Sequence, residues 1–324
     1  MSTYRVAAYQ PDWADSWNQL IGKAKNATFL FHRSFMEYHA DRFTDASHCI
    51  FKGNELLAVF PANLSENKWI SHQGLSYGGL VVGPEVKFNS YVEMLLALFE
   101  KAADAGIEEV VIKAIPDIYC QQPAQELDYM SFVCGAKTLK VESASTIALQ
   151  NALPIQSNRL EGYKKAKKLG LKIKNSTDFK AFWDEVLIPN LEARHEAKPV
   201  HTAEEISSLQ LDFPDNIHLY LVYDKERLAG GAVLFETDTT AHVQYIAAGP
   251  DRQQLGTLDF LFEFLITDEF DHLDYFDFGI STVSGGKELN SGLLYWKECF
   301  GARTTANKTY GFDPKQTENL KALL

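Results

Sequence analysis

The residues with the clearest chemical potential lie near the C-terminus, in the run Asn290 to Ala302 (NSGLLYWKECFGA). Tyr295, Trp296 and Lys297 are consecutive in a segment whose apolar residues recur at helical spacing. A lysine beside a tryptophan is a poor choice for packing alone, and a partly buried ammonium stabilises negative charge that develops on oxygen. We therefore expect Lys297 to act in catalysis with Trp296 and Tyr295; plain core packing is the alternative.

A second run, Gly249 to Thr257 (GPDRQQLGT), follows a strand-like segment and opens an apolar helix. Unpaired N–H groups and the helix dipole favour anions at such a place, so the run predicts a pyrophosphate cradle. An ordinary turn between a strand and a helix is the alternative. The run has neither the glycine spacing of a Rossmann motif nor the G-K-S/T of a Walker loop.

The segment Arg159 to Lys174 is strongly basic, with seven basic residues and one acidic residue. Lys164 and Lys168 are four residues apart and share one helix face, which suits contact with phosphates. A solvated helix face is the alternative interpretation. The whole chain carries a net charge of −12, which argues against duplex DNA and anionic membranes as general partners.

Histidines supply candidates for proton transfer and substrate contact. His242 and Gln244 occupy alternate positions of one predicted strand, and His195 and His201 lie in a long connection that ends at a predicted capping box, Thr202 with Glu205. Surface or core histidines are the alternative. No spacing of His, Cys, Asp and Glu predicts a metal site.

The chain has 324 residues, 46% of them apolar, and its four cysteines lie far apart without a C-x-x-C motif. This length suits two domains rather than one, and the thiols are expected to be reduced. No stretch reaches the roughly 18 apolar residues of a membrane span, and the first residues lack a signal-peptide pattern. We expect a cytoplasmic protein without membrane insertion.

The elements that position these residues form an internal repeat. Gly135 and Gly301 lie in matching runs, CGAKT and FGART, and three further pairs of strands and helices follow the same order in both halves. The alternation of strands and helices predicts an α/β (α+β) fold. We expect two tandem halves, 1–155 and 156–324, each with a mixed, mostly antiparallel sheet flanked by helices.

The order of strand, glycine turn, helix and strand, followed by Asn290, Tyr295-x-Lys297 and Phe300-Gly301, resembles the acetyl-CoA-binding core of GNAT acyltransferases. Their pyrophosphate loop reads Gln or Arg, two residues, Gly, one residue, then Gly or Ala. Gln253 to Leu258 matches its first glycine and departs at Leu258. The duplication and the glycine-rich run Gly74 to Pro84 are similar to the FemAB branch, tandem-GNAT transferases that add amino acids to peptidoglycan precursors.

This resemblance implies transfer of an acyl group from acetyl-CoA or another acyl-CoA to an amine of a small molecule, sugar or cell-wall precursor. It implies an oxyanion role for Trp296 and Lys297 and protonation of the leaving thiolate by a tyrosine, for which Tyr295 is one position out of register. We expect His242 or a water molecule to act as the base. We expect donor binding by Arg252, Gln253, Gln254, Gly256, Thr257 and Asn290, and substrate binding by Gln244, His195, His201, Lys164, Lys168 and Tyr77. Two alternatives remain: aminoacyl-tRNA as the donor for a peptidoglycan-like precursor, or a GNAT pair that binds without catalysis.

Overall fold

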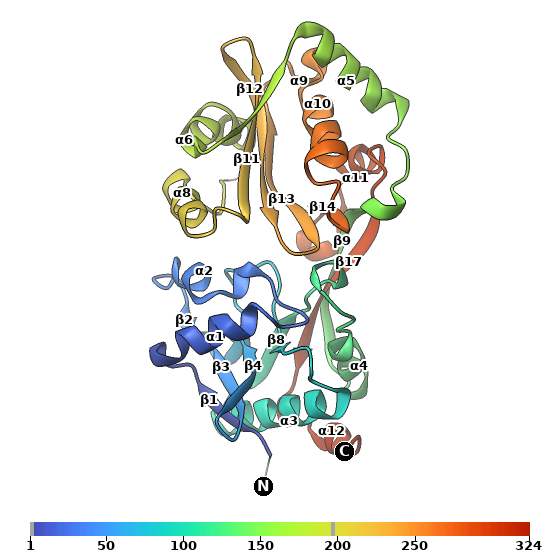
Figure 1. Cartoon of the computed structure of the whole chain (residues 1–324). Helices are drawn as coiled ribbons and strands as arrows, with labels where there is room; N and C mark the ends of the chain where they lie inside the picture. The colour runs from blue at the N-terminus through green and yellow to red at the C-terminus, as the bar shows by residue number, and fades with distance from the viewer. Residues whose placement is uncertain (1–2, 196–197) are drawn as a thin grey trace. The chain divides into compact units, whose positions relative to one another are not determined.

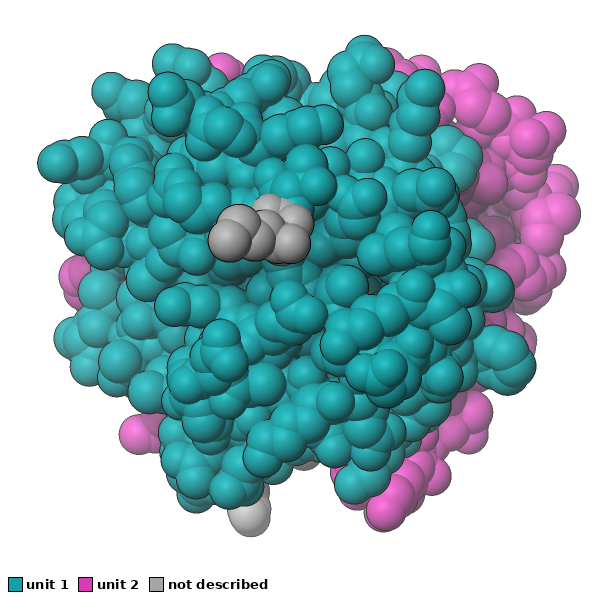
Figure 2. Space-filling model, turned by 90° about the horizontal axis from the view of Figure 1, so that it is seen from below, with its two compact units in different colours: residues 1–142, 306–324 teal, residues 143–305 magenta. Residues whose placement is uncertain are grey.

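The computed structural model describes residues 3–195 and 198–324, without the side chains of Arg194 and His195. The chain forms two compact units: unit 1 comprises residues 1–142 and 306–324, and unit 2 comprises residues 143–305 (Figure 2). These bounds differ from the expected halves 1–155 and 156–324. Two long strands, β9 (Lys137–Ala148) and β17 (Arg303–Phe312), each pass from one unit to the other. The end of β17 belongs to unit 1 because it pairs antiparallel with β8 (Glu109–Lys113).

Unit 1 contains a four-stranded sheet of order β1-β3-β4-β7 and a second group of strands in which β6 and β8 are parallel. Its other strands are β1 (Arg5–Ala8), β2 (Thr44–Asp45), β3 (His48–Lys52), β4 (Glu55–Phe60), β5 (Asn63–Ser65), β6 (Lys68–Ile70) and β7 (Val81–Val82). Its helices are α1 (Ala14–Ile21), α2 (Arg33–Glu37), α3 (Phe88–Asp104), α4 (Glu126–Val133) and α12 (Glu318–Lys321). The apolar face of α3 forms the centre of the core of this unit.

Unit 2 contains a sheet of order β10-β11-β12-β13-β14-β9, antiparallel except for the pair β13 and β14. Its strands are β10 (Lys172–Ser176), β11 (Ile217–Asp224), β12 (Arg227–Glu236), β13 (Thr240–Ala248) and β14 (Tyr275–Ile280), with a hairpin of β15 (Thr282–Val283) and β16 (Glu288–Leu289). Its helices are α5 (Ser157–Leu169), α6 (Phe179–Phe182), α7 (Ile188–His195), α8 (Ala203–Asp212), α9 (Arg252–Leu255), α10 (Thr257–Phe264) and α11 (Ser291–Glu298).

Helices cover both faces of the unit 2 sheet, with α5, α10 and α11 on one side and α6 and α8 on the other (Figure 1). Phenylalanines of β14, α10 and the end of α11 pack together on the first side, where Phe262 stacks on Phe278 at 5.2 Å. The mixed α/β architecture expected from the sequence is confirmed.

The repeat is visible in the structure as two matching successions of helix, glycine turn and strand. Helix α4 leads through Gly135 into β9, and α11 leads through Gly301 into β17. Both glycines have positive φ, 62° and 97°, a conformation that residues with a Cβ avoid. The other expected matches fall on β8 with β14, on α3 with α10, and on β4 with β12.

Candidate functional site

The strands β13 and β14 separate after a short parallel contact. They pair from Thr240 with Tyr275 to His242 with Asp277, whereas β13 continues to Ala248. Beyond His242, one edge of β13 therefore has no neighbouring strand in the part of the chain that the structure describes. Ligands of α/β sheets commonly bind where strands part in this way.

A cavity of about 480 Å³ lies in unit 2 at this opening. The end of β13, the turn before α10 and the first turns of α11 form most of its wall. It is lined by Arg159, Asn190, Ile246, Ala247, Ala248, Arg252, Gln253, Leu258, Asp259, Asn290, Gly292, Leu293 and Trp296. Its size is that of a small-molecule site, and its wall combines apolar side chains with two arginines.

The open edge of β13 presents main-chain groups to this cavity. Gln244 is an extra residue of β13, because β12 pairs with Val243 and then with Tyr245. The Ala248 carbonyl accepts a hydrogen bond from Asn190 Nδ2 at 2.9 Å, while the next amide, that of Gly249, donates to β12. Because alternate residues of a strand direct their main-chain groups to opposite edges, Ile246 faces the opening as Ala248 does.

At the point of separation, His242 and Asp277 form a side-chain pair. His242 Nδ1 lies 2.9 Å from Asp277 Oδ2. The other oxygen, Oδ1, accepts hydrogen bonds from the Gly279 amide at 3.0 Å and from Thr146 Oγ1 at 3.1 Å. Asp277 is 2% exposed, whereas the His242 side chain is 21% exposed and reaches solvent. These side chains point away from the face on which Phe276, Phe278 and α11 pack.

Lys297 is buried and holds the end of β14. Its ammonium donates to the carbonyls of Gly279 at 2.8 Å and of Ile280 at 2.7 Å. Burial lowers the pKa of Lys297 to about 8, although the nearby Asp277 carboxylate opposes this shift. Consecutive helix residues point about 100° apart, so the ammonium lies on the strand end while the Trp296 ring faces other neighbours. Two main-chain carbonyls therefore hold the Lys297 ammonium in place.

Trp296 and Tyr295 differ in their surroundings. The Trp296 ring lines the cavity and contacts the rings of Phe262, Phe278 and Phe300 at 5.1 to 5.6 Å. Tyr295 is 58% exposed and lies outside the cavity wall. Asn290 caps α11, since its Oδ1 accepts from the Leu293 amide at 3.0 Å, and it also lines the cavity.

The turn before α10 places Arg252 and Gln253 in the cavity wall, but Gln254, Gly256 and Thr257 are not part of it. The amides of Arg252, Leu255 and Gly256 already donate to carbonyls inside the turn. Thr257 is fully buried, and its hydroxyl has no hydrogen-bond partner. The expected cradle of free amides is therefore only partly present.

Most of the basic run lies in α5, which packs on α10 beside the cavity, and its last residues lie in β10. Lys164 and Lys168 are exposed, and Lys165 donates to the Gln253 carbonyl at 3.1 Å. Arg159 and Asp259 form an ion pair of 2.8 Å in the cavity wall. Burial raises the pKa of Asp259, while the charge of Arg159 opposes this shift.

The remaining candidates lie in different places. His201 is buried and contacts the Tyr245 hydroxyl through Nδ1 at 2.6 Å, and Gln244 follows His242 on β13. His195 ends α7, and its side chain is outside the described part. Tyr77 lies in unit 1, where its ring is buried, stacks on Tyr119 at 4.6 Å and donates to Thr28 Oγ1 at 3.1 Å.

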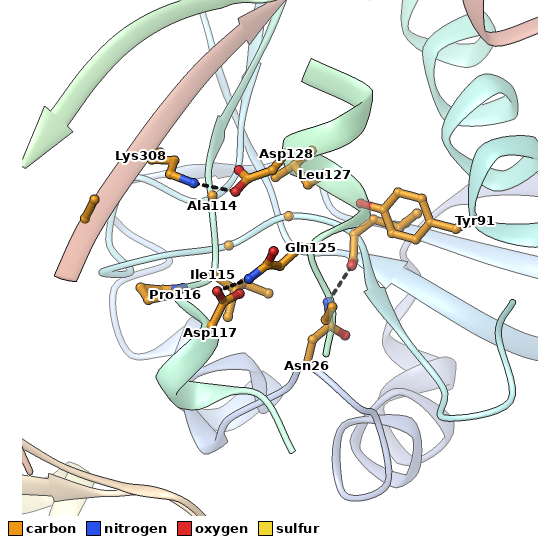
Figure 3. A pocket seen from close by; sticks show the side chains of 15 residues that line it. Asn26, Tyr91, Ala114, Ile115, Pro116, Asp117, Gln125, Leu127, Asp128 and Lys308 are labelled. Atoms are coloured by element: carbon orange, nitrogen blue, oxygen red, sulfur yellow. Dashed lines mark hydrogen bonds and ion pairs between the residues drawn. The ribbon is translucent and has the colours of Figure 1, made fainter. Parts of the chain in front are cut away.

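Unit 1 has a much smaller pocket, of about 50 Å³, at the start of α4, the helix that corresponds to α11 (Figure 3). Polar side chains fill it: Lys308 pairs with Asp128, and Gln125 donates to Asp117. The pocket beside α4 and the cavity beside α11 occupy matching places in the repeat. Of these two places, as the described residues form them, only the cavity in unit 2 has space for a large ligand.

Sequence reasoning missed Asp277, Asn190 and the ion pair of Arg159 with Asp259. For Asp277 a signal existed, because a carboxylate inside the apolar run Phe276-Asp277-Phe278 must find partners when the strand is buried. Nothing local marked Asn190, whose role depends on the strand that it reaches. Within residues 3–195 and 198–324, no group of three or more His, Cys, Asp and Glu side chains is arranged to hold a metal ion.

No helix in the described residues combines the length and apolar character needed to cross a membrane. No protein-family model matches the sequence, and no curated protein matches it.

Solved structures match over nearly the whole chain. FemX aligns with a TM-score of 0.65 and 11% identity, covering 95% of this chain and 97% of FemX. L-PGS from Bacillus licheniformis aligns with a TM-score of 0.60 and 11% identity, covering 97% and 95%. The C-terminal domain of a putative lysylphosphatidylglycerol synthetase from Agrobacterium fabrum aligns with a TM-score of 0.59 and 12% identity, covering 96% and 95%. The chain therefore has the fold of FemX, of L-PGS and of the synthetase C-terminal domain, as the resemblance to the FemAB branch implied.

Proposed function

We propose that this chain is an acyltransferase that binds its donor in the unit 2 cavity and transfers an acyl group to an amine. The observation that carries the proposal is the separation of β13 from β14, which opens into a cavity of about 480 Å³. An extended donor with amide groups would bind along the open edge of β13, as a peptide adds to a sheet edge.

Acyl-CoA is the proposed donor. Its pantetheine arm is extended and carries amides, which suits the main-chain groups of Ile246 and Ala248. Its phosphates would lie toward Arg252 and the lysines of α5, where positive charge gathers in an otherwise acidic protein.

The acceptor amine would attack the donor carbonyl from the face on which His242 lies. His242 Nε2 takes one proton from the attacking nitrogen, the new C–N bond forms, the C–S bond breaks, and CoA leaves as a thiolate. Amides of the open β13 edge would stabilise the oxyanion. Lys297 would act by holding Gly279 and Ile280 in place rather than by direct contact with the oxyanion.

Aminoacyl-tRNA is the second candidate donor, with a cell-envelope precursor as acceptor. The exposed basic face of α5 beside the cavity favours it, since an RNA backbone would contact several lysines in a row. A protein with the same fold is named for lysylphosphatidylglycerol, a lysyl conjugate of a lipid.

The test is calorimetric titration with acetyl-CoA and longer acyl-CoAs, followed by transfer assays with radiolabelled acyl-CoA or aminoacyl-tRNA and a panel of amines. Acyl transfer from acyl-CoA supports the proposal, and transfer only from aminoacyl-tRNA supports the second candidate. Binding of acyl-CoA without transfer to any amine would indicate a binding module. If neither donor binds, the proposed donor site is wrong.

A further inference from the structure

We infer that Asp277 is a positioning residue that holds His242 in the tautomer protonated at Nδ1, so that Nε2 is the basic nitrogen offered to the acceptor amine. This inference rests on the proposed function and deepens it, because it identifies what makes the proposed base competent.

The first support is the geometry of the carboxylate. Asp277 Oδ2 is 2.9 Å from His242 Nδ1, and an ionised carboxylate only accepts hydrogen bonds, so the shared proton belongs to Nδ1. Two donors, the Gly279 amide and Thr146 Oγ1, bind Oδ1 and fix the plane of the carboxylate. The imidazole orientation is therefore set by a carboxylate that is itself held.

The second support is burial. Asp277 is 2% exposed and lies between two phenylalanines in the sequence of β14. Burial of a carboxylate costs desolvation free energy that an apolar residue at this position would not, so its hydrogen-bond partners must offset that cost. Its partner His242 is 21% exposed, so the pair runs from the core to solvent at the end of the β13 and β14 contact. The Lys297 ammonium from α11 also interacts electrostatically with Asp277.

In the proposed step, the acceptor nitrogen forms a bond to the donor carbonyl carbon and loses one proton to His242 Nε2. The imidazolium that results has N–H groups on both nitrogens, and its Nδ1–H stays bound to the Asp277 carboxylate. The leaving thiolate carries away the electron pair of the C–S bond. The proton on Nε2 is then released to solvent, and the pair is restored.

The experiment compares Asp277→Asn with Thr305→Val in the full chain. An asparagine preserves shape, but its amide donates to Nδ1 and moves the imidazole proton to Nε2. We expect kcat to fall about 10²- to 10⁴-fold, the range that a general base supplies, with donor affinity unchanged and the acid side of the pH–rate profile displaced. Thr305 contacts Thr146 Oγ1 at 3.0 Å and not Asp277, so its valine variant should retain activity within a few-fold.

A second measurement does not depend on activity. Nitrogen NMR of the parent protein, with the His242 resonances assigned by their loss in His242→Gln, should show Nδ1 protonated at neutral pH. A ring protonated at Nε2 in the parent, or full turnover in a folded Asp277→Asn protein, overturns the inference. Protonation at Nδ1 in a protein that transfers from no donor supports the positioning by Asp277 and refutes the proposed function instead.

Discussion

Gly256 and Gly162 lie so close that a β-carbon on Gly256 would stand 2.2 Å from the Gly162 carbonyl oxygen. The glycine of the turn before α10 is thus required for the packing of α5 on that turn. From the sequence, its small size is explained equally well by room for a phosphate, but the nearest neighbour is a helix backbone.

Replacing Gly256 by alanine should therefore destabilise unit 2. Its φ of 72° disfavours a side chain by about 1–2 kcal/mol, and the contact with Gly162 adds to this. Gly170→Ala is the matched control, because Gly170 ends α5 with φ 81° and a Cβ there meets nothing within 4 Å. In urea unfolding, the free energy of unfolding of Gly256→Ala should be well below that of Gly170→Ala. Equal values for the two variants would contradict the packing of Gly256 against Gly162.

Gly292 allows the cavity to be blocked without disturbing the fold. It lines the cavity on the first turn of α11, and a Cβ there meets only Asn290 Oδ1 at 3.8 Å. Gly292→Phe should abolish donor binding in calorimetry while the melting temperature stays at or above that of the parent. Gly292→Ala should bind donor normally and be more stable by about 0.5–1 kcal/mol. Unaltered binding by the phenylalanine variant would show that the donor lies elsewhere.

The exposed lysines of α5 should attract the anionic part of the donor. The double variant Lys164→Glu with Lys168→Glu should weaken binding more at 0.01 M than at 0.15 M salt, because the Debye length falls from about 30 Å to about 8 Å. Lys23→Glu with Lys315→Glu makes the same change of charge on exposed residues of unit 1 and serves as the control. If both pairs of substitutions weaken donor binding equally, the effect comes from the net charge of the protein and not from the position of the lysines on α5.

Buried histidines should make unit 1 sensitive to acid. Burial lowers the pKa of His48 to about 4 and that of His72 to about 3, against about 6.5 for an unfolded chain. As the pH falls below about 6.5, these histidines bind protons in the unfolded state but stay neutral in the folded state. The free energy of unfolding therefore decreases progressively toward pH 4. His48→Gln should lessen the loss between pH 7 and pH 4.5 in urea unfolding. An undiminished loss of stability in a folded His48→Gln protein would contradict this prediction.

Lys297 should make stability depend on pH in the same direction, but in an alkaline range. Its pKa is lowered to about 8 in the folded protein, against about 10.4 when unfolded, so its contribution to stability rises between these two values. Lys297→Met removes this rise and leaves the carbonyls of Gly279 and Ile280 without their donor, at about 1–3 kcal/mol each. The gap in unfolding free energy between parent and variant should widen from pH 8 to pH 10. A constant gap would mean that the ammonium is not buried as described.

Much of the fold could be predicted from the sequence, because local sequence patterns determine its turns and helix ends. The glycine turns at Gly135 and Gly301 and the capping box of Thr202 with Glu205 depend only on neighbouring residues, and each appears in the structure. The passage of β17 into unit 1 could not be predicted from the sequence, because it depends on the pairing of Thr309 to Phe312 with β8, a strand about 200 residues earlier.

The candidate site was accessible only in part. Arg252, Gln253, Asn290 and Trp296 line the cavity as their segments suggested, since strand ends and helix starts meet at one edge of a sheet. Asn190 and Asp277 act through partners that are 58 and 35 residues away in the chain, and no spacing within a segment reveals such pairs.

The crossing of β17 has a consequence for biosynthesis. Most of unit 1 precedes unit 2 in the chain, yet only one edge of β8, the edge beside β6, has a partner strand until residues 309–312 are made. Residues 143–305 emerge from the ribosome while the other edge is still unpaired, so unit 2 can be completed first although it comes later in the chain. A nascent chain stalled before β17 would then expose an unpaired strand edge of unit 1, a template for association with other chains that chaperones would have to cover.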